Sequence, residues 1–504
     1  MVDNRKVVIV GAGVGGITTA ISLAREGYQV EVFEKNAAPG GRCGQVVRDG
    51  HRFDLGATML LMPGIYREVF GSLGIELEAG RDIFPLKDLY KIHFDDGTSL
   101  SFTSDIERMR DQLERIESGS YKMAERYIKG GYEIFRLGME KLIGRNFYNL
   151  FQLVNFRNIG LLIRLKIFIS NWNYAKKYFR HPHLRMAYTF QNIYVGQSPF
   201  DSPALFSMIP AAELTEGSFF VKGGMFGIIE KLMEAAEKSG VVFHFNSPAG
   251  KIEIANGKAA GIKLEDGTFH DAGIVIANAD LPYVYRKLLP DKRKAERLEK
   301  LKYSCSAVCL HWGLDKEYPQ LDHHNVFLSD GYKEGLDRIF RDKTMGDKPS
   351  FYVHAPARSD PDAAPAGQES LSFVVATGHL DKGKEQDWNS IKKRAHDYII
   401  KRLKESGLDD IEQHIKFELA YTPESWETGC NVARGAVFGS LGHNILQMGY
   451  FRPHNRHDRY KNLYFTGGST HPGNGIPNVL ISARLVTERI LSVRNNKNKS
   501  ESNR

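Results

Sequence analysis

The chain of 504 residues contains only four cysteines, Cys43, Cys305, Cys309 and Cys430. Cysteines so few and so widely spaced exclude the disulfide framework of a small secreted domain. Cys305 and Cys309 are four residues apart, but no second Cys or His pair at metal-ligand spacing completes a zinc site. We therefore expect buried apolar thiols, no metal and a reducing compartment.

Long apolar runs are also missing. No stretch of about 18 apolar residues occurs, so the sequence predicts no membrane-spanning helix. The N-terminus leads directly into an apolar strand, Val7–Val10, and no signal peptide is expected. The polar end, residues 496–504, is expected to be a disordered tail. Charged residues make up 25% and hydrophobic residues 42%, which is typical of a globular protein of two or three domains.

Acidic residues are absent from the segment Lys141–Arg185, which contains nine Lys or Arg residues, more than the net charge of +8 of the whole chain. Its apolar stretch, Gly160–Trp172, is too short to span a membrane. A basic, aromatic segment without acids suits the surface of an anionic bilayer, and the alternative is a core helix or a solvated face. We favour membrane docking and expect a cytoplasmic protein bound peripherally to the membrane. No nucleic-acid motif accompanies the charge, so no nucleic-acid partner is expected.

A glycine-rich turn follows the first strand. Residues 11–16 read GAGVGG, and residues 17–33 show a helical spacing followed by a second strand. Gly11 permits the tight turn, Gly13 lets the backbone approach a pyrophosphate, and Gly16 lets the helix pack close to the sheet. The N-terminus of the helix then offers N–H groups to the phosphates.

The second strand ends at Glu34, where a carboxylate accepts hydrogen bonds from adenosine ribose hydroxyls. It would repel a 2′-phosphate, which disfavours NADP. Ala20, Gly27 and Val30 complete the strand–turn–helix–strand pattern. The pattern predicts a Rossmann-type site for the ADP part of a dinucleotide, but it does not separate FAD from NAD.

Two blocks after Glu34 narrow this choice. Residues 39–42 read PGGR, and residues 56–59 read GATM. The pattern resembles the flavin amine oxidase and phytoene desaturase superfamily, in which the glycine pair and the arginine lie along the FAD pyrophosphate and ribityl chain. The resemblance therefore implies FAD as the cofactor.

The C-terminal block supports the same family. Residues 469–479 read STHPGNGIPNV, between a strand ending in Gly467-Gly468 and a helix expected over Leu480–Leu491. This block resembles the C-terminal signature of the bacterial and fungal-type phytoene desaturases (the carotenoid desaturase family), where it closes over the flavin ring. A helix N-terminus there would stabilise negative charge on reduction. His471 is either a catalytic acid/base or a loop residue hydrogen-bonded to backbone, and we favour the second interpretation.

The middle of the chain resembles the family more loosely. The blocks Phe200–Ser207 and Gly217–Met225 match, but Val221 replaces the usual proline. By resemblance, Ala249 would touch the adenine end and Asn278 would lie where the chain passes the FAD; an ordinary strand and turn is the alternative for both. The implied set of FAD contacts is Gly11, Gly13, Gly15, Gly16, Glu34, Lys35, Gly40, Gly41, Arg42, Gly56, Ala57, Thr58, Met59, Ala249, Asn278, Gly467, Gly468, Gly475, Ile476, Pro477 and Val479.

The resemblance implies an α/β fold with a discontinuous Rossmann-type FAD-binding domain and a second domain for substrate. The FAD-binding domain is expected over residues 1–75, 220–285 and 455–495. The substrate domain, of mixed sheet and helices, is expected over 76–219 and 286–454, with 105–200 mainly helical and facing a membrane.

The implied activity is that of an FAD-dependent carotenoid desaturase. A hydride goes to flavin N5 and a proton leaves the adjacent carbon of a long polyene such as phytoene, a later carotene or a hydroxycarotenoid. A quinone or oxygen would then take the electrons. No paired carboxylates and no nucleophile with a partner base are evident, so no catalytic residue is assigned. The alternatives are an FAD-dependent carotenoid isomerase, an amine or protoporphyrinogen oxidase of the same fold, and a flavin-free carrier of prenylated partners.

Overall fold

A computed structural model describes residues 5–152 and 156–502. Its first sheet is five-stranded and parallel, in the order β10-β2-β1-β14-β20. Its strands come from three distant parts of the chain: β1 (Lys6–Val10), β2 (Gln29–Phe33), β10 (Val242–His244), β14 (Ile274–Ala277) and β20 (Leu463–Phe465). Val7, Val8 and Ile9 have no exposed surface, as expected of a parallel strand covered on both faces.

Alternate residues of β1 enter two apolar clusters. Val7 and Ile9 pack with the helices α1 (Val14–Arg25), α9 (Phe226–Lys238) and α15 (Ile476–Ser502). Val8 and Val10 pack with the opposite layer. That layer contains an antiparallel sheet of β11 (Ala249–Ala255), β12 (Lys258–Leu264) and β13 (Phe269–Asp271), with α10 (Leu281–Tyr283) and α11 (Lys292–Glu299). A turn at Asn256 and Gly257 joins β11 to β12.

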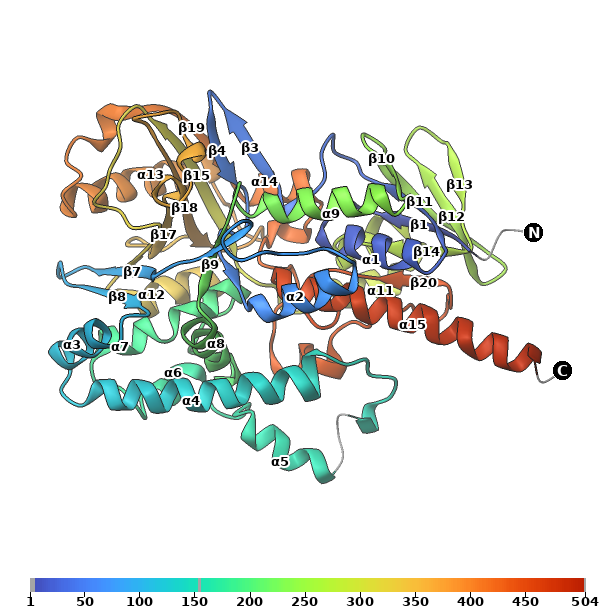
Figure 1. Ribbon diagram of the computed structural model, residues 1–504, viewed down its shortest axis with the longest axis horizontal. Coiled ribbons are helices and arrows are strands. Elements are labelled where there is room, and N and C mark those ends of the chain that lie inside the picture. Colours follow the sequence, from blue (N-terminus) through green and yellow to red (C-terminus); the bar gives the residue numbers. More distant parts are fainter. Residues whose placement is uncertain (1–4, 153–155, 503–504) are drawn as a thin grey trace.

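The second large sheet has seven strands in the order β19-β15-β18-β17-β16-β7-β8. Figure 1 shows it at the opposite end of the molecule from the parallel sheet. All of its pairings are antiparallel except that of β16 with β7. Its strands are β7 (Asp88–Phe94), β8 (Ser99–Thr103), β15 (Ser306–Leu314), β16 (His324–Leu328), β17 (Phe351–His354), β18 (Glu369–Thr377) and β19 (Ile415–Tyr421).

The two faces of this sheet have different neighbours. Trp312, Phe373 and Val375 pack against the helix α13 (Trp388–Glu405) in one apolar cluster. Side chains on the opposite face of the same strands, such as Cys309 and Val374, face a cavity instead. The strands of the two large sheets fall within the stretches expected for the two domains, and the domain boundaries themselves stay a prediction.

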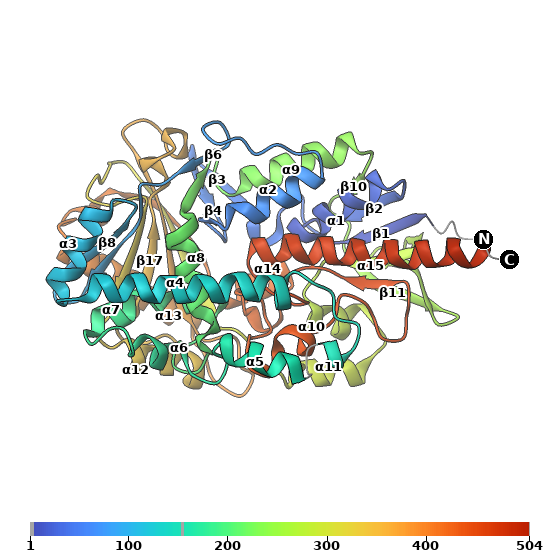
Figure 2. The same ribbon diagram turned by 60° about the horizontal axis from the view of Figure 1, so that its bottom comes forward.

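Helices connect the sheets along one side of the molecule. α4 lies across the molecule, with the shorter α5, α6 and α7 beside it (Figure 2). Packing is close, because a Cβ added to Gly131 of α4 would stand 2.7 Å from Cβ of Ala211 on α8. These helices are α3 (Ile106–Ile116), α4 (Ser120–Gly138), α5 (Phe156–Arg164), α6 (Asn171–Ala175), α7 (Pro182–Ala187) and α8 (Met208–Glu216).

Short elements link these layers. They are β3 (Gln45–Arg48), β4 (His51–Asp54), β5 (Leu60–Leu61), α2 (Pro63–Ser72), β6 (Ile83–Pro85), β9 (Ser218–Val221), α12 (Tyr332–Asp337) and α14 (Pro423–Cys430). None of the helices in the described part of the chain combines the length and apolar character needed to cross a membrane.

The last helix differs from the expectation. α15 begins at Ile476, four residues before the predicted Leu480, and continues to Ser502 through most of the predicted disordered tail. No Gly or Pro interrupts residues 480–502, so a helix that is docked at its start can propagate along polar sequence. Residues 503–504 of the predicted tail lie outside the described residues.

Candidate active site

A cavity of about 850 Å³ extends between the two large sheets. All the predicted FAD contacts except Gly16 line it. They form one end of the cavity, at the carboxyl ends of the parallel strands, which is where α/β sheets bind ligands. We call this end, with the residues that the sequence predicted there, the cofactor cradle.

Gly16 supports the cradle from below. A Cβ at this position would stand 2.2 Å from the carbonyl oxygen of Gly11, so any side chain would push α1 away from β1. Gly56 is equally restricted, because its Cβ would lie 2.0 Å from the carbonyl oxygen of Arg42. The N-cap of α1 is Gly13, and no side chain caps the helix. The first-turn N–H groups are therefore suited to a pyrophosphate.

Glu34 lies where the sequence placed it, at the end of β2. Its Oε2 accepts a hydrogen bond from the Ala12 N–H (2.8 Å) and its Oε1 accepts one from the Asn36 N–H (2.9 Å). These bonds fix the carboxylate at the edge of the glycine turn. Lys35 donates to the Thr428 carbonyl (2.6 Å) and to Asn431 Oδ1 (3.1 Å), and burial lowers its pKa. Lys35 therefore holds the loop after α14 against the cradle.

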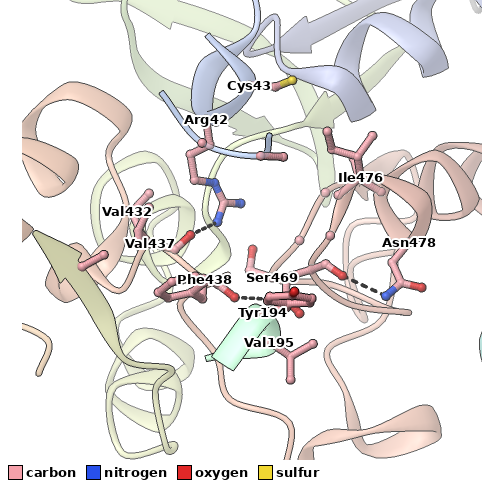
Figure 3. A pocket seen from close by; sticks show the side chains of 18 of the residues that line it. Arg42, Cys43, Tyr194, Val195, Val432, Val437, Phe438, Ser469, Ile476 and Asn478 are labelled. Carbon is pink, nitrogen blue, oxygen red and sulfur yellow. Dashed lines mark hydrogen bonds between the residues drawn. The ribbon is translucent and has the colours of Figure 1, made fainter. Parts of the chain in front are cut away.

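Arg42 joins the N-terminal and C-terminal halves of the cradle. Its Nη1 donates to the Val437 carbonyl (2.8 Å), and Figure 3 shows the guanidinium reaching toward that oxygen. The space beside Gly468 is filled by the same guanidinium, since a Cβ there would lie 3.1 Å from Nη2. Ile476 lines the cavity at the first turn of α15.

Asn278 fastens the glycine turn to the end of β14. Its Nδ2 donates to the Gly11 carbonyl (3.1 Å), and the side chain occupies the space beside Gly13 and Gly15. Its amide is thus engaged with the protein while it also lines the cavity.

Arg452 is a buried residue that the sequence did not reveal. It is 1% exposed and donates to five backbone carbonyls, including those of Gly468 (2.6 Å) and Thr470 (3.0 Å). Burial lowers its pKa to about 9, so it stays charged at neutral pH. Arg452 therefore holds the C-terminal signature loop in shape.

Two buried carboxyl groups hold other parts of the site together. Asp280 accepts hydrogen bonds from the Ala433 N–H (2.9 Å) and from the Ser440 hydroxyl, and burial raises its pKa. Asp54 accepts from the Met225 N–H (2.8 Å), and burial raises its pKa to about 6. Neither was predicted, because a single Asp carries no local signature.

The rest of the cavity is mainly apolar, and we call it the apolar arm. Its wall is the face of the seven-stranded sheet that does not contact α13, together with helical residues between positions 190 and 209 and residues of α12. The lining side chains include Phe190, Ile193, Tyr194, Leu205, Phe206, Ile209, Val326, Leu328, Leu336, Ile339, Tyr352, Val374 and Ala376. The carboxylates among the described lining residues are Glu34, Glu265 and Asp280, and all three belong to the cradle end.

His471 lines the cavity near the signature loop. Its Nε2 donates to the Arg145 carbonyl (3.0 Å), which matches the interpretation as a loop residue hydrogen-bonded to backbone. Burial lowers its pKa to about 4, so the ring is neutral at physiological pH.

Three buried histidines lie close together in the seven-stranded sheet, although no metal site was expected. His323, His324 and His354 bring ring nitrogens within 4.8 Å of one another, and none of them lines the cavity. Ring nitrogens of His323 and His354 are 3.2 Å apart, as in a hydrogen bond, and His324 Nδ1 is 2.6 Å from the Tyr352 hydroxyl. His323 and His354 therefore pair with each other, and the neutral ring of His324 supports Tyr352, whose hydroxyl is 2.7 Å from Thr58 Oγ1.

Comparison with known proteins agrees with this geometry. The chain belongs to the family of flavin-containing amine oxidoreductases, whose model matches residues 14–491. It is 39% identical to the zeta-carotene-forming phytoene desaturase of Myxococcus xanthus, over 97% of this chain and 94% of that protein. It is 38% identical to the phytoene desaturase of Phycomyces blakesleeanus, over 97% and 86% of the two chains.

A solved structure of putrescine oxidase with putrescine bound shares the fold. Its TM-score is 0.63 at 15% identity, and the match covers 97% of this chain and 99% of that one. The family and the fold confirm the predicted α/β fold of mixed sheets and helices and the FAD cofactor. The residues of the cradle fit this cofactor, since the uncapped N-terminus of α1 and the Glu34 carboxylate line one cavity.

Proposed function

We propose that this protein is an FAD-dependent carotenoid desaturase, acting on phytoene, a later carotene or a hydroxycarotenoid. The observation that carries the proposal is one continuous cavity, in which the cofactor cradle opens directly into an apolar arm without carboxylates among its described lining residues. A charged amine would find no counter-ion there, whereas a polyene would lose its contact with water on entering. The two desaturase relatives support the same substrate class.

The chain's own residues have three tasks in this reaction. When bound, FAD supplies the acceptor for a hydride from an allylic carbon. The cradle holds that acceptor at the end of the arm, and the arm aligns the polyene with it. Apolar residues such as Phe206, Leu336 and Val374 exclude water from the cationic carbon chain that hydride loss leaves behind.

The test is spectroscopic. Purified protein is mixed anaerobically with candidate carotenoids in liposomes, and the visible spectrum is followed. We expect the flavin band to bleach while the carotenoid bands move to longer wavelength. A carotenoid spectrum that changes while the flavin stays oxidised would identify an isomerase, and no change with any carotenoid would overturn the proposal.

The basic segment 141–185 is proposed to dock on the membrane from which the polyene enters. Leu142 and Ile143 of this segment line the cavity, so segment and cavity are continuous. Ile163 and Phe168 are 57% and 75% exposed. Exposed apolar side chains among cations are suited to an anionic lipid surface.

We further propose a cytoplasmic location with peripheral attachment to the membrane, and a quinone or oxygen as the electron acceptor. A lipid-soluble quinone would be available at the same surface. Anaerobic reoxidation of the reduced protein by a quinone in liposomes would distinguish it from oxygen.

A further inference from the structure

Glu213 is a buried carboxyl group behind the apolar arm, and it has no cationic partner among the residues that the structure describes. Glu213 of α8 is 1% exposed. Its Oε2 accepts a hydrogen bond from the Tyr90 hydroxyl (3.2 Å), and its Oε1 is 3.5 Å from the Tyr194 hydroxyl. Gln191 donates to the Tyr90 hydroxyl (2.9 Å) and completes the group.

Burial makes this carboxyl weakly acidic. Desolvation raises the pKa of Glu213 to about 8, and the hydrogen bonds of Tyr90, Tyr194 and Gln191 only partly oppose the rise. The groups that face Glu213 are thus a phenol of β7 and a phenol and an amide from residues 190–195, and none is charged at neutral pH. A buried carboxyl with a strongly shifted pKa beside a cavity is a candidate for a functional site.

Tyr194 connects Glu213 to the cavity. It lines the cavity, and its hydroxyl is 3.9 Å from the sulfur of Met59, a residue of the cradle. Figure 3 shows its ring on the side of the pocket away from Arg42 and Cys43. The phenol is therefore at the wall where cradle and apolar arm meet, with the carboxyl directly behind it.

We propose that Tyr194 and Glu213 accept the proton released in the desaturation, an inference that rests on the function proposed above. One C–H bond loses its hydrogen with both electrons to the flavin. The neighbouring C–H bond gives its proton to the Tyr194 oxygen as the phenolic proton moves to the Glu213 carboxylate, and the electron pair left on carbon forms the new double bond. Between turnovers Glu213 returns this proton through Tyr194 to water.

The pair predicts how the rate depends on pH. The carboxylate form is the acceptor, and its fraction rises tenfold per pH unit below the pKa of about 8. Desaturation should therefore increase from pH 6 to pH 8 and level off above it. His471 of the signature loop has a pKa of about 4 and would give a flat profile over this range.

The experiment compares Glu213→Gln and Tyr194→Phe with a matched control, Glu216→Gln. Glu216 lies on the same helix and does not line the cavity, and its Oε1 accepts a hydrogen bond from the Tyr132 hydroxyl (3.1 Å). We expect Glu213→Gln and Tyr194→Phe to lower kcat about 100-fold at pH 8, the size of a general-base contribution. Glu213→Gln should also give a flat pH profile, while Glu216→Gln keeps the rising one.

A second readout does not depend on turnover. Infrared difference spectra of wild type minus Glu213→Gln should show a protonated carboxyl band at pH 7 that disappears above pH 8. The pKa of Glu213 in the folded protein lies above its ordinary value of 4.5. The contribution of this carboxyl to stability is therefore complete below about pH 4.5 and is lost as the pH rises through 8. The Tm of the wild type should accordingly fall relative to Glu213→Gln over that interval.

The two proposals fail in different ways. A wild type that desaturates no carotenoid overturns both. A wild type that desaturates, with a rising pH profile that Glu213→Gln leaves unchanged, overturns only the proton-accepting pair. Absence of the protonated carboxyl band at pH 7 would also overturn only the proton-accepting pair.

Discussion

The cofactor cradle and the apolar arm are two ends of one cavity, yet they are built by different rules. The cradle is rich in glycines, and at Gly16 and Gly56 a Cβ would stand about 2 Å from a backbone carbonyl oxygen. Hydrogen bonds to backbone fix its charged residues Glu34 and Arg42. The arm consists of side chains of ordinary size, contributed one or two at a time by strands and helices far apart in the sequence. The cradle is therefore specified by backbone geometry, and the arm by volume. Substitutions in the cradle should therefore weaken FAD binding, whereas substitutions in the arm should lower kcat/KM for the carotenoid.

The largest effect is expected for Gly16→Ala in the cradle. The new Cβ would stand 2.2 Å from the Gly11 carbonyl oxygen and 2.8 Å from Asn278 Nδ2. We expect FAD to bind about a thousandfold more weakly, which corresponds to ~4 kcal/mol, so that the purified protein is colourless. Flavin absorbance per mole of protein is the measurement. Gly71→Ala is the control, because its Cβ would meet nothing within 4 Å. A yellow Gly16→Ala protein would show that the cradle tolerates volume as the arm does.

Arg452→Met tests whether the C-terminal part of the cradle depends on one buried cation. The substitution leaves five backbone carbonyls without their donor. We expect the free energy of unfolding to fall by about 3 kcal/mol and FAD to dissociate on dilution. Thermal unfolding and flavin fluorescence measure the two losses. The exposed Arg459→Met should change neither, and equal behaviour of the two variants would contradict the assigned role.

Substitutions of Val374 test whether carotenoid turnover depends on the free volume of the arm. Val374→Phe places a ring in the cavity, so we expect kcat/KM for a carotenoid to fall about 30-fold, or ~2 kcal/mol, while the flavin spectrum stays intact. Val374→Ala enlarges the arm and should retain most of the activity. Loss of flavin from Val374→Phe would show that the two ends are not separable.

The smallest effect concerns the membrane segment. Ile163→Ser with Phe168→Ser removes two exposed apolar side chains, and we expect about tenfold weaker sedimentation with anionic liposomes, with FAD and stability unchanged. Phe269→Ser, at a position 50% exposed on β13, is the control. Raised salt should weaken binding of wild type and variants alike. Unchanged sedimentation of the double variant would contradict the docking proposal.

The same contrast explains what the sequence could predict. The glycine turn, Glu34 and the signature loop stand in local patterns, and the structure gathers them in one cavity with Gly16 beneath it. Arg452 and Glu213 are single residues whose role depends on what folds around them, and no neighbouring residue marks them. Their partners lie at Gly468 and Thr470, and at Tyr90 and Tyr194, so only the tertiary fold joins them.

The sequence predicted a polyene substrate, but it did not predict which residues form the arm. An apolar residue such as Val326 or Leu336 reads like any core position, since periodicity tells that a side chain is buried but not whether it faces a cavity. The extension of α15 was missed for another reason. Polar residues after position 495 resemble a disordered end, whereas propagation from a docked helix keeps them helical to Ser502.

The order of strands in the parallel sheet has a consequence for biosynthesis. β1 lies at residues 6–10, but its sheet is complete only when β20, at residues 463–465, has been made. At roughly 5–20 residues per second, β14 leaves the ribosome about 10 to 40 s before β20, its second partner in the sheet. During that interval one edge of β14 has no partner, although β1, β2 and β10 can already pair. A chain that ends before residue 463 lacks β20 and the signature loop that lines the cavity, so we expect it not to bind FAD.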